Sequence, residues 1–275
     1  MRLQSLHVYP IKSAGGFTVD GWDADEFGLR YDRRWMLISP DGTFITQRDL
    51  PGMALLRTEI ELPMLTVNAP GASTLRIPLE PAGVAELTVR VWKDRCAALL
   101  PSPEADAWFS EVLRYPCRLA YLQGGTLRPV DPSYTKVQRR VSFADAFPFL
   151  IIGMGSLDDL NQRLVHPVPM NRFRPNLVVS GGGPFAEDGW ETIRIGSLEF
   201  DLVKPCARCL VPTTDQATGM RHARQEPLRT LATYRRQKGM VMFGQNALHS
   251  GPGRLNAGDE VEVLVARSGG GGFPV

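Results

Sequence analysis

The chain has 275 residues, of which 43% are hydrophobic and 22% are charged, and its formal net charge is +2. These values are typical of a globular protein with a substantial core, and about 150 residues per domain predicts two domains. The low net charge gives no indication of nucleic-acid binding. The N-terminus lacks the apolar core of a signal peptide, and no long apolar run occurs, so we predict a cytoplasmic protein without membrane contact.

The first half of the chain is predicted to form mostly short strands between proline and glycine breaks. Trp35–Ile38 and Thr43–Gln47 flank Pro40-Asp41-Gly42, which is typical of a hairpin turn. Further β-rich runs lie at Leu65–Val67, Leu75–Leu79 and Leu87–Trp92. Short strands at regular spacing indicate a barrel or a curled sheet.

Few segments are predicted to be helical. One helix follows Ser102-Pro103, a second follows Ser156, and a third begins at Glu226-Pro227. Strands of the second half are expected at Leu177–Ser180, Thr192–Ile195, Leu198–Val203 and Val261–Val265. We therefore predict a mainly β, α+β protein with two barrel-like halves and a few peripheral helices. The predicted boundaries are residues 1–122, residues 123–267 and a disordered tail at 268–275.

Half of the four cysteines stand in one short segment, Lys204-Pro205-Cys206-Ala207-Arg208-Cys209. A thiolate is the reactive and metal-binding form of cysteine, and the neighbouring cations favour it. The alternative is that both cysteines are buried fillers at the end of a strand. Either way, four unevenly spaced cysteines predict reduced thiols and not a disulfide framework.

Two other cysteine chemistries are less compatible with this segment. A closed zinc site needs four ligands, but the chain has one Cys-x-x-Cys pair and no spaced histidine pair. A dithiol redox motif opens a helix, whereas residues 210–215 are predicted to be extended chain and turn. Thiol–disulfide exchange therefore stays an outside alternative.

Polar groups suited to an anion follow the first predicted strand, Leu6–Tyr9. Lys12 and Ser13 precede Gly15-Gly16, so a cation, a hydroxyl and an adaptable backbone converge in one loop. The segment is not a P-loop, because there the glycines come before the lysine. A solvated lysine beside a turn is the alternative.

Asp32-Arg33-Arg34-Trp35 is predicted to begin the next strand. Strand alternation would send Arg33 and Trp35 to one face and Arg34 to the other. An inward guanidinium requires an acceptor, and its planar fork suits phosphate or carboxylate. A salt bridge to Asp32 or Asp25 is the alternative.

Two further segments carry amide side chains. Asn171–Asn176 contains two cations and leads into a predicted strand, with Pro175 stiffening it. Phe243–Asn246 is predicted to be a polar loop feeding a closing strand. Asn246 is a possible hydrogen-bond partner for a ligand amide or heterocycle, with a plain turn as the alternative.

Together these segments resemble the MOSC family, the molybdenum cofactor sulfurase C-terminal domain proteins, and in particular its amidoxime-reducing members. The resemblance covers almost the whole chain and includes an N-terminal MOSC β-barrel domain. It rests on five motifs that occur in the family's order: Tyr9-Pro10-Ile11-Lys12-Ser13, Asp32-Arg33-Arg34-Trp35, Phe173-Arg174-Pro175-Asn176, Cys206–Cys209 with Thr213-Thr214-Asp215, and Phe243-Gly244-Gln245-Asn246.

The resemblance implies a set of site residues. Cys209 matches the catalytic protein ligand to molybdenum, whereas Cys206 matches a position that does not bind the metal. Some relatives have a small hydroxyl residue where this chain has Phe147, which implies backbone contacts there. The implied cofactor contacts are Lys12, Ser13, Arg33, Asp145, Ala146, Phe147, Arg174, Asn176, Ala207, Arg208 and Asn246.

The resemblance also implies a function. It implies a molybdenum cofactor, no iron–sulfur cluster in this chain, and reduction of amidoximes and other N-hydroxylated bases with oxygen leaving as water. A separate reductase or electron carrier would supply the electrons. The resemblance also implies pyridoxal phosphate binding. An anionic, phosphate-bearing pterin needs cations, amides and one soft thiolate, which these residues supply. The alternative is a non-catalytic carrier of the cofactor or of sulfane sulfur on Cys209.

Overall fold

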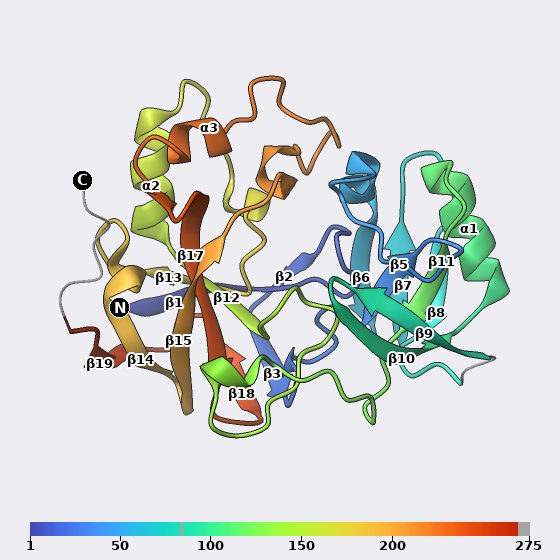
Figure 1. Ribbon diagram of the computed structural model, residues 1–275, viewed down its shortest axis with the longest axis horizontal. Coiled ribbons are helices and arrows are strands. Elements are labelled where there is room, and N and C mark those ends of the chain that lie inside the picture. Colours follow the sequence, from blue (N-terminus) through green and yellow to red (C-terminus); the bar gives the residue numbers. More distant parts are fainter. Residues whose placement is uncertain (83–84, 269–275) are drawn as a thin grey trace.

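The computed structural model describes residues 1–82 and 85–268. Its strands form two groups that lie side by side, one built around a large sheet and the other made of two smaller sheets (Figure 1). The mainly β, α+β class predicted from the sequence is confirmed. The predicted tail at residues 268–275 lies, apart from Ser268, outside the described residues.

One mixed sheet of nine strands dominates the second half of the chain. All of its paired neighbours are antiparallel except β12 and β13, which are parallel. Its strands, in spatial order, are β19 (Val261–Ala266), β14 (Trp190–Ile195), β15 (Leu198–Ala207), β17 (Met240–His249), β12 (Phe149–Gly153), β13 (Leu177–Ser180), β1 (Arg2–Val8) and β2 (Phe17–Val19), and β16 (Arg236–Gln237) pairs with β17.

Three smaller sheets complete the strands that the structure describes. In spatial order, the four-stranded sheet contains β5 (Trp35–Ile38), β11 (Arg118–Tyr121), β10 (Asp94–Leu100) and β9 (Ala85–Val91). The two three-stranded sheets contain β6 (Arg57–Glu61), β7 (Met64–Asn68) and β8 (Leu75–Pro78), and β18 (Gly253–Asn256), β3 (Gly21–Asp25) and β4 (Gly28–Leu29). The sheets are open and do not close into barrels, which agrees with the curled-sheet form of the prediction.

The start of the chain belongs structurally with its second half. β1 pairs with β13, for example Leu6 with Leu177, and β3 pairs with β18. The chain then crosses to the small sheets at Trp35 and returns with β12. The boundary at residues 122 and 123 stays a prediction, but strand pairing links residues on both sides of it.

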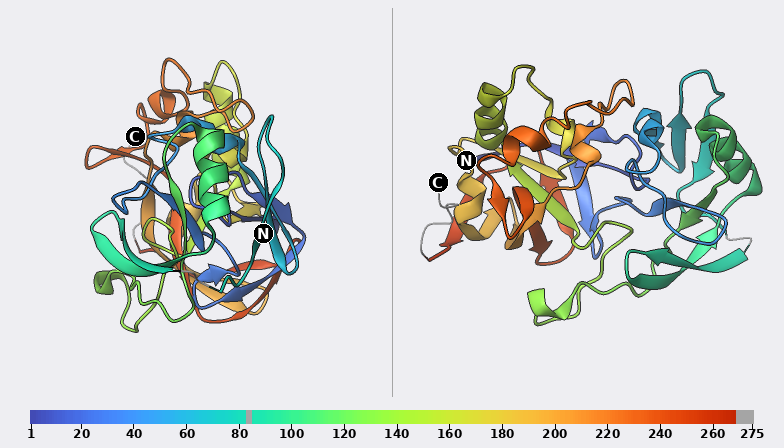
Figure 2. Two further views of the ribbon diagram at one scale, coloured as in Figure 1. Left: turned by 90° about the vertical axis from the view of Figure 1, so that its right-hand side faces the viewer. Right: turned by 45° about the horizontal axis from the view of Figure 1, so that its top comes forward.

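Helices are few and lie around the sheets (Figure 2). They are α1 (Pro103–Leu113), α2 (Met154–Arg163) and α3 (Leu228–Leu231), with 3-10 turns η1 (Pro51–Leu55), η2 (Pro132–Tyr134), η3 (Met170–Arg172), η4 (Ala186–Gly189) and η5 (Val211–Thr213). Across residues 1–82 and 85–268, no helix has both the length and the apolar character needed to cross a membrane.

The predicted helix starts are borne out in two of three cases. The Ser102 hydroxyl accepts the Ala105 N–H at 3.2 Å and caps α1, and α3 follows Pro227 but lasts only four residues. α2 begins before Ser156, because that hydroxyl instead donates to the buried Glu187 carboxylate at 2.8 Å. Thr43–Gln47 is not a strand, since only isolated bridges form at Thr43 and Phe44.

Aromatic contacts fix the strands that carry the site. Phe149 of β12 meets Phe200 of β15 edge-to-face with ring centroids 5.1 Å apart. Phe173 lies 4.2 Å from Phe243 of β17, and all four rings are buried. Each such pair contributes about 0.5–1.5 kcal/mol beyond area burial, so the strand ends hold a fixed geometry.

Candidate functional site

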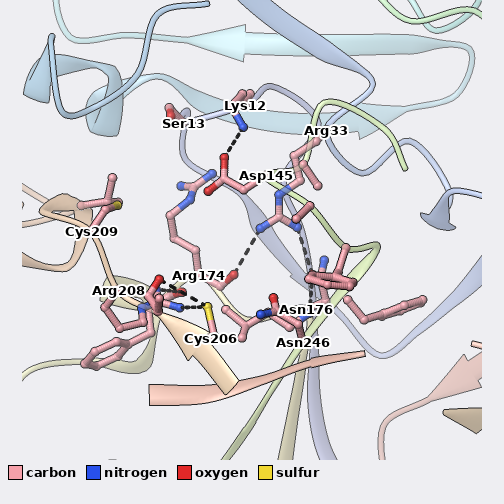
Figure 3. A pocket seen from close by; sticks show the side chains of 18 of the residues that line it. Lys12, Ser13, Arg33, Asp145, Arg174, Asn176, Cys206, Arg208, Cys209 and Asn246 are labelled. Carbon is pink, nitrogen blue, oxygen red and sulfur yellow. Dashed lines mark hydrogen bonds and ion pairs between the residues drawn. The ribbon is translucent and has the colours of Figure 1, made fainter. Parts of the chain in front are cut away.

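A cavity of about 260 Å³ lies where the two groups of strands meet. All twelve residues that the sequence singled out line it, although they are spread from position 12 to position 246 (Figure 3). The structure thus brings together every predicted site residue, while their roles toward a cofactor stay predictions.

Each residue reaches the cavity from a strand, a turn or a short loop. The contributing segments are the turn after β1 (Lys12, Ser13), the turn before β5 (Arg33), the loop before β12 (Asp145, Ala146, Phe147), the segment before β13 (Arg174, Asn176), the end of β15 and the following turn (Ala207, Arg208, Cys209), and β17 (Asn246).

One side of the cavity, here called the buried wall, consists of Lys12, Arg33, Arg174 and Asn176. Arg33 forms an ion pair with Asp32 and donates to the Asn176 side-chain oxygen at 3.0 Å. A second Arg33 N–H group donates to the Arg174 carbonyl at 3.2 Å. These contacts fix the Arg33 fork before any ligand binds.

Arg33 does not lie on a strand, so the predicted alternation at Asp32–Trp35 is wrong. β5 begins at Trp35, and Arg33 occupies a turn with φ of 49°. Arg33 still lines the cavity, while Arg34 points elsewhere and donates to the Leu122 carbonyl at 2.6 Å and 3.0 Å. Arg33 therefore both lines the cavity and forms the ion pair with Asp32, so the two alternatives given by the sequence hold together.

Arg174 is a buried cation of the wall. Its side chain is 8% exposed, donates to the Ala14 carbonyl at 2.6 Å and lies 4.3 Å from the Tyr9 ring centroid. Burial, together with the nearby charge of Arg33, lowers the pKa of Arg174 to about 10. An anion in the cavity would offset that cost, because it favours the charged form.

Lys12 is tied to the loop before β12. Its ammonium donates to the Phe143 carbonyl at 2.7 Å and to the Asp145 carboxylate at 2.5 Å. The Trp92 indole N–H also donates to Asp145, at 3.1 Å. Burial raises the pKa of Asp145, but the charge and hydrogen bond of Lys12 outweigh that effect and hold the pKa well below its usual range.

The opposite side of the cavity, here called the cysteine turn, is residues 206–209. Arg208 donates to the Cys206 sulfur at 3.0 Å and to the Phe173 carbonyl at 2.6 Å. Its Nε is buried and has no hydrogen-bond partner within the described part of the chain. Cys206 is half-buried and Cys209 is exposed, which contradicts the interpretation of both as buried fillers.

The chain after the cysteine turn forms the predicted turn but not the predicted extended chain. η5 forms a single 3-10 turn at Val211–Thr213. All four cysteines are free, and Cys96 and Cys117 are buried away from the cavity.

Asn246 reaches the cavity from a strand. Phe243–Asn246 belongs to β17, so the predicted polar loop is wrong. Gln245, its neighbour, is fully buried and donates to the Asp188 carboxylate at 2.7 Å. Strand alternation then turns Asn246 toward the cavity.

Two cations of the cavity were not among the predicted site residues. In the sequence Lys204 is only a neighbour of the thiols, whereas in the structure it lines the cavity and its ammonium lies 5.2 Å from the Tyr134 ring centroid. Arg48 carried no sequence signal, and its guanidinium stacks 4.2 Å from the Trp92 ring centroid. Asp215, a conceivable proton donor, does not line the cavity and pairs with Arg172 at 2.9 Å.

The cavity is strongly electropositive. Six of its lining side chains are cations, whereas one lining side chain, Asp145, is a carboxylate. Such an excess calls for an anionic ligand, and the arginine forks suit phosphate oxygens. The unpartnered Arg208 Nε and the exposed Cys209 thiol add a hydrogen-bond donor and a soft metal ligand, so these residues fit a phosphate-bearing molybdenum cofactor.

Comparison with known protein families gives two matches. The MOSC N-terminal beta barrel domain matches residues 1–116, and the MOSC domain matches residues 138–262.

Curated relatives fall into two groups. Mitochondrial amidoxime-reducing component 1 is 35% identical in Mus musculus, covering 94% of this chain and 81% of the relative, and 33% identical in Homo sapiens, covering 94% and 82%. Molybdenum cofactor sulfurase of Oryza sativa subsp. japonica is 34% identical over 89% of this chain but only 32% of the relative.

Among solved structures, the YuaD protein from Bacillus subtilis aligns with 94% of this chain and 93% of its own. Its identity is 12% and its TM-score is 0.43, which is too low to support an argument.

Proposed function

We propose that this chain, which belongs to the MOSC family, is a molybdenum cofactor-dependent reductase of N-hydroxylated compounds such as amidoximes. The observation that carries the proposal is the cavity, because it combines six cations and one carboxylate with an exposed thiol. Relatives named for amidoxime reduction, aligned over 94% of the chain, support the same conclusion.

The buried wall would hold the anionic part of the cofactor. Lys12, Arg33 and Arg174 already lie in fixed positions through their protein contacts, so little ordering is needed on binding. Each charge-assisted hydrogen bond contributes about 1.5–3 kcal/mol, so several of them suffice for tight retention without a covalent link to the pterin.

The cysteine turn would hold the reactive part. Cys209 would provide the thiolate ligand, and Arg208 would keep the turn in place through its bond to the Phe173 carbonyl. Arg208 also donates to the Cys206 sulfur, so that sulfur already has a partner in the protein. This division assigns the two cysteines different roles.

The proposed reaction consumes two electrons and two protons, breaks the N–O bond, forms an N–H bond and releases water. When bound, the molybdenum cofactor supplies the two-electron redox chemistry. Asp145 would stay ionised near neutral pH, because its pKa is held low, and would therefore orient Lys12 instead of donating a proton. Solvent, which reaches the exposed Cys209 side, would supply the protons, and a separate donor would supply the electrons.

The proposal is tested on protein produced in cells with an intact cofactor pathway. Molybdenum is measured by elemental analysis, and turnover of an amidoxime is measured with reduced viologen as the electron source. We expect molybdenum close to stoichiometric with protein and turnover that scales with molybdenum content. Protein that carries molybdenum yet fails to reduce any N-hydroxylated substrate would contradict the proposal.

A carrier function is the second candidate. The exposed Cys209 and the match to molybdenum cofactor sulfurases both favour it. A carrier would release its cofactor or sulfur to an acceptor protein without amidoxime turnover. The viologen assay therefore separates the two functions.

A further inference from the structure

The positive charge of this chain is concentrated beside the cysteine turn. Residues 210–240 hold six of the 31 Lys and Arg residues but two of the 29 Asp and Glu residues, which leaves the rest of the chain with a net charge of −2. Five of these six cations are exposed, and they are here called the cationic face: Arg221, Arg224, Arg229, Arg236 and Lys238.

Backbone contacts place the cationic face on both sides of the cysteine turn. On one side, the Arg208 N–H donates to the Val241 carbonyl at 2.8 Å, and Val241 pairs with Arg236 in the β16–β17 hairpin. On the other side, Thr214 forms a bridge with Arg221. These segments lie beside the end of β15 (Figures 1 and 2).

No exposed acid neutralises this face within residues 210–240, all of which the structure describes. Asp215 pairs with Arg172 and accepts the N–H groups of Ala217 and Thr218 at 2.9 Å. Glu226 accepts the Thr230 N–H at 3.1 Å. Both carboxylates therefore already have partners other than the cations of the face.

Exposed apolar side chains lie among these cations. Leu210 is 38% exposed, Met240 is 47% exposed and Met220 is 71% exposed. All three come from residues 210–240, and Leu210 directly follows Cys209 in the chain. Exposed apolar side chains in a segment rich in charge are the composition of a transient protein interface.

We propose that the cationic face is the docking surface for a small acidic electron-carrier protein. The inference rests on the proposed function, which needs electrons from outside the chain. Opposite charges would steer the carrier to the exposed Cys209, and a small contact area would let it leave after each transfer. A one-electron carrier would be oxidised once per visit, so two visits would supply the electron pair for each N–O bond.

Nucleic acid is the less suitable anion for this surface. Residues 210–240, described throughout, expose no Phe, Tyr or Trp side chain on which bases could stack. The exposed apolar groups are instead aliphatic or thioether side chains beside the reactive thiol.

The test measures binding of an acidic plant-type [2Fe–2S] ferredoxin, used as the probe, to the cofactor-loaded full chain by calorimetry. The variant Arg224→Glu/Arg236→Glu/Lys238→Glu reverses charge on both sides of the cysteine turn. The matched control, Arg2→Glu/Arg76→Glu/Arg114→Glu, reverses three exposed cations of distant elements. We expect the first variant to weaken binding about tenfold or more and the control less than about twofold, with wild-type binding weakened by raising salt from about 20 mM to about 300 mM.

Reduced viologen needs no docking surface, so turnover with viologen should be equal in all three proteins. Absent viologen turnover in the wild type would contradict the proposed function, whereas the docking surface is judged by the binding data alone. Equal binding by the two charge-reversed variants would overturn the docking surface. Tighter binding of duplex DNA or of phosphatidylserine vesicles than of ferredoxin, with the same dependence on these three charges, would also overturn it.

Discussion

The buried wall and the cysteine turn face each other across one cavity but are built in opposite ways. The wall gathers residues from three distant segments, and its cations are anchored by carboxylates, carbonyls and the Tyr9 ring. The cysteine turn comes from four consecutive residues, ends in an exposed thiol and leaves one buried guanidinium nitrogen unpartnered among the described residues. The difference separates binding, which needs a rigid framework, from chemistry, which needs an accessible group.

Replacing the exposed thiol should have the largest effect on turnover. Cys209→Ala removes the proposed metal ligand but none of the contacts of the buried wall. We expect amidoxime reduction to fall by at least about 100-fold, or about 2.7 kcal/mol in the activation barrier, while pterin content falls less than about twofold. Viologen-driven turnover and pterin fluorescence after release are measured on the same samples. If Cys209→Ala retained wild-type turnover per bound molybdenum, the cysteine turn would not be the reactive side of the cavity.

Removing one anchor of the buried wall should instead reduce stability. Arg33→Gln leaves the Asp32 carboxylate, 1% exposed, with the Tyr9 backbone N–H as its remaining charge-stabilising donor. We expect the free energy of unfolding to fall by about 3–5 kcal/mol, measured by urea denaturation.

Two further variants control for this result. Asp32→Asn/Arg33→Gln should recover part of the loss, because no buried charge remains unpaired. Arg254→Gln breaks an exposed pair with Asp23 and should cost less than about 1 kcal/mol. A similar cost for Arg33→Gln and Arg254→Gln would show that the wall is no more rigid than the surface.

Acid should loosen the wall through His7. The His7 backbone pairs with Asn176, and burial lowers the pKa of His7 to about 4. Because the unfolded chain takes up this proton near pH 6.5, the contribution is fully present above that pH and is lost as the pH falls toward 4. We expect a loss of about 2–3 kcal/mol between pH 7.5 and pH 4.5 from this group.

The contribution of His7 is isolated by substitution. His7→Gln can keep hydrogen bonds to the Ser5 and Thr18 hydroxyls without titrating, so its stability should depend less on pH in this range. His166→Gln, at an exposed position, is the matched control and should leave the wild-type slope unchanged. An unchanged slope in His7→Gln as well would contradict the assignment.

The smallest effect is expected at Cys206. Its sulfur accepts a hydrogen bond from Arg208, and a serine hydroxyl can replace that acceptor. Cys206→Ser should therefore change amidoxime turnover per molybdenum by less than about twofold. Equal loss in Cys206→Ser and Cys209→Ser would favour a dithiol mechanism, in which both sulfurs form and break a disulfide.

Local signals predicted the elements with strong periodicity or clear caps, such as α1 behind Ser102 and β13 at Leu177–Ser180. Local pattern predicts a strand at Arg33, whereas its backbone adopts a positive φ that belongs to a turn. Phe243–Asn246 resembled a loop because of its glycine and amides. Its polarity is satisfied by a tertiary contact, because the Gln245 side chain donates to the Asp188 carboxylate of η4.

Gly244 explains why that strand tolerates a loop-like composition. Its φ is 80°, and a Cβ there would lie 2.6 Å from the Ile152 side chain and 3.0 Å from the Ile151 carbonyl. The close approach of β12 and β17 is a tertiary requirement that no local pattern reports. The site residues were predicted through family resemblance, while Arg48 needed the fold, because its partner Trp92 comes from another hairpin.

The pairing of β1 with β13 affects how the chain is made and how it can be cut. At a synthesis rate of about 5–20 residues per second, β1 leaves the ribosome roughly 10–30 s before its partner strand exists. A fragment restricted to residues 138–262 would lack β1 and leave one edge of β13 without its native partner. An unpaired edge invites association between chains, so the matched MOSC segment should aggregate when it is expressed without the first 19 residues.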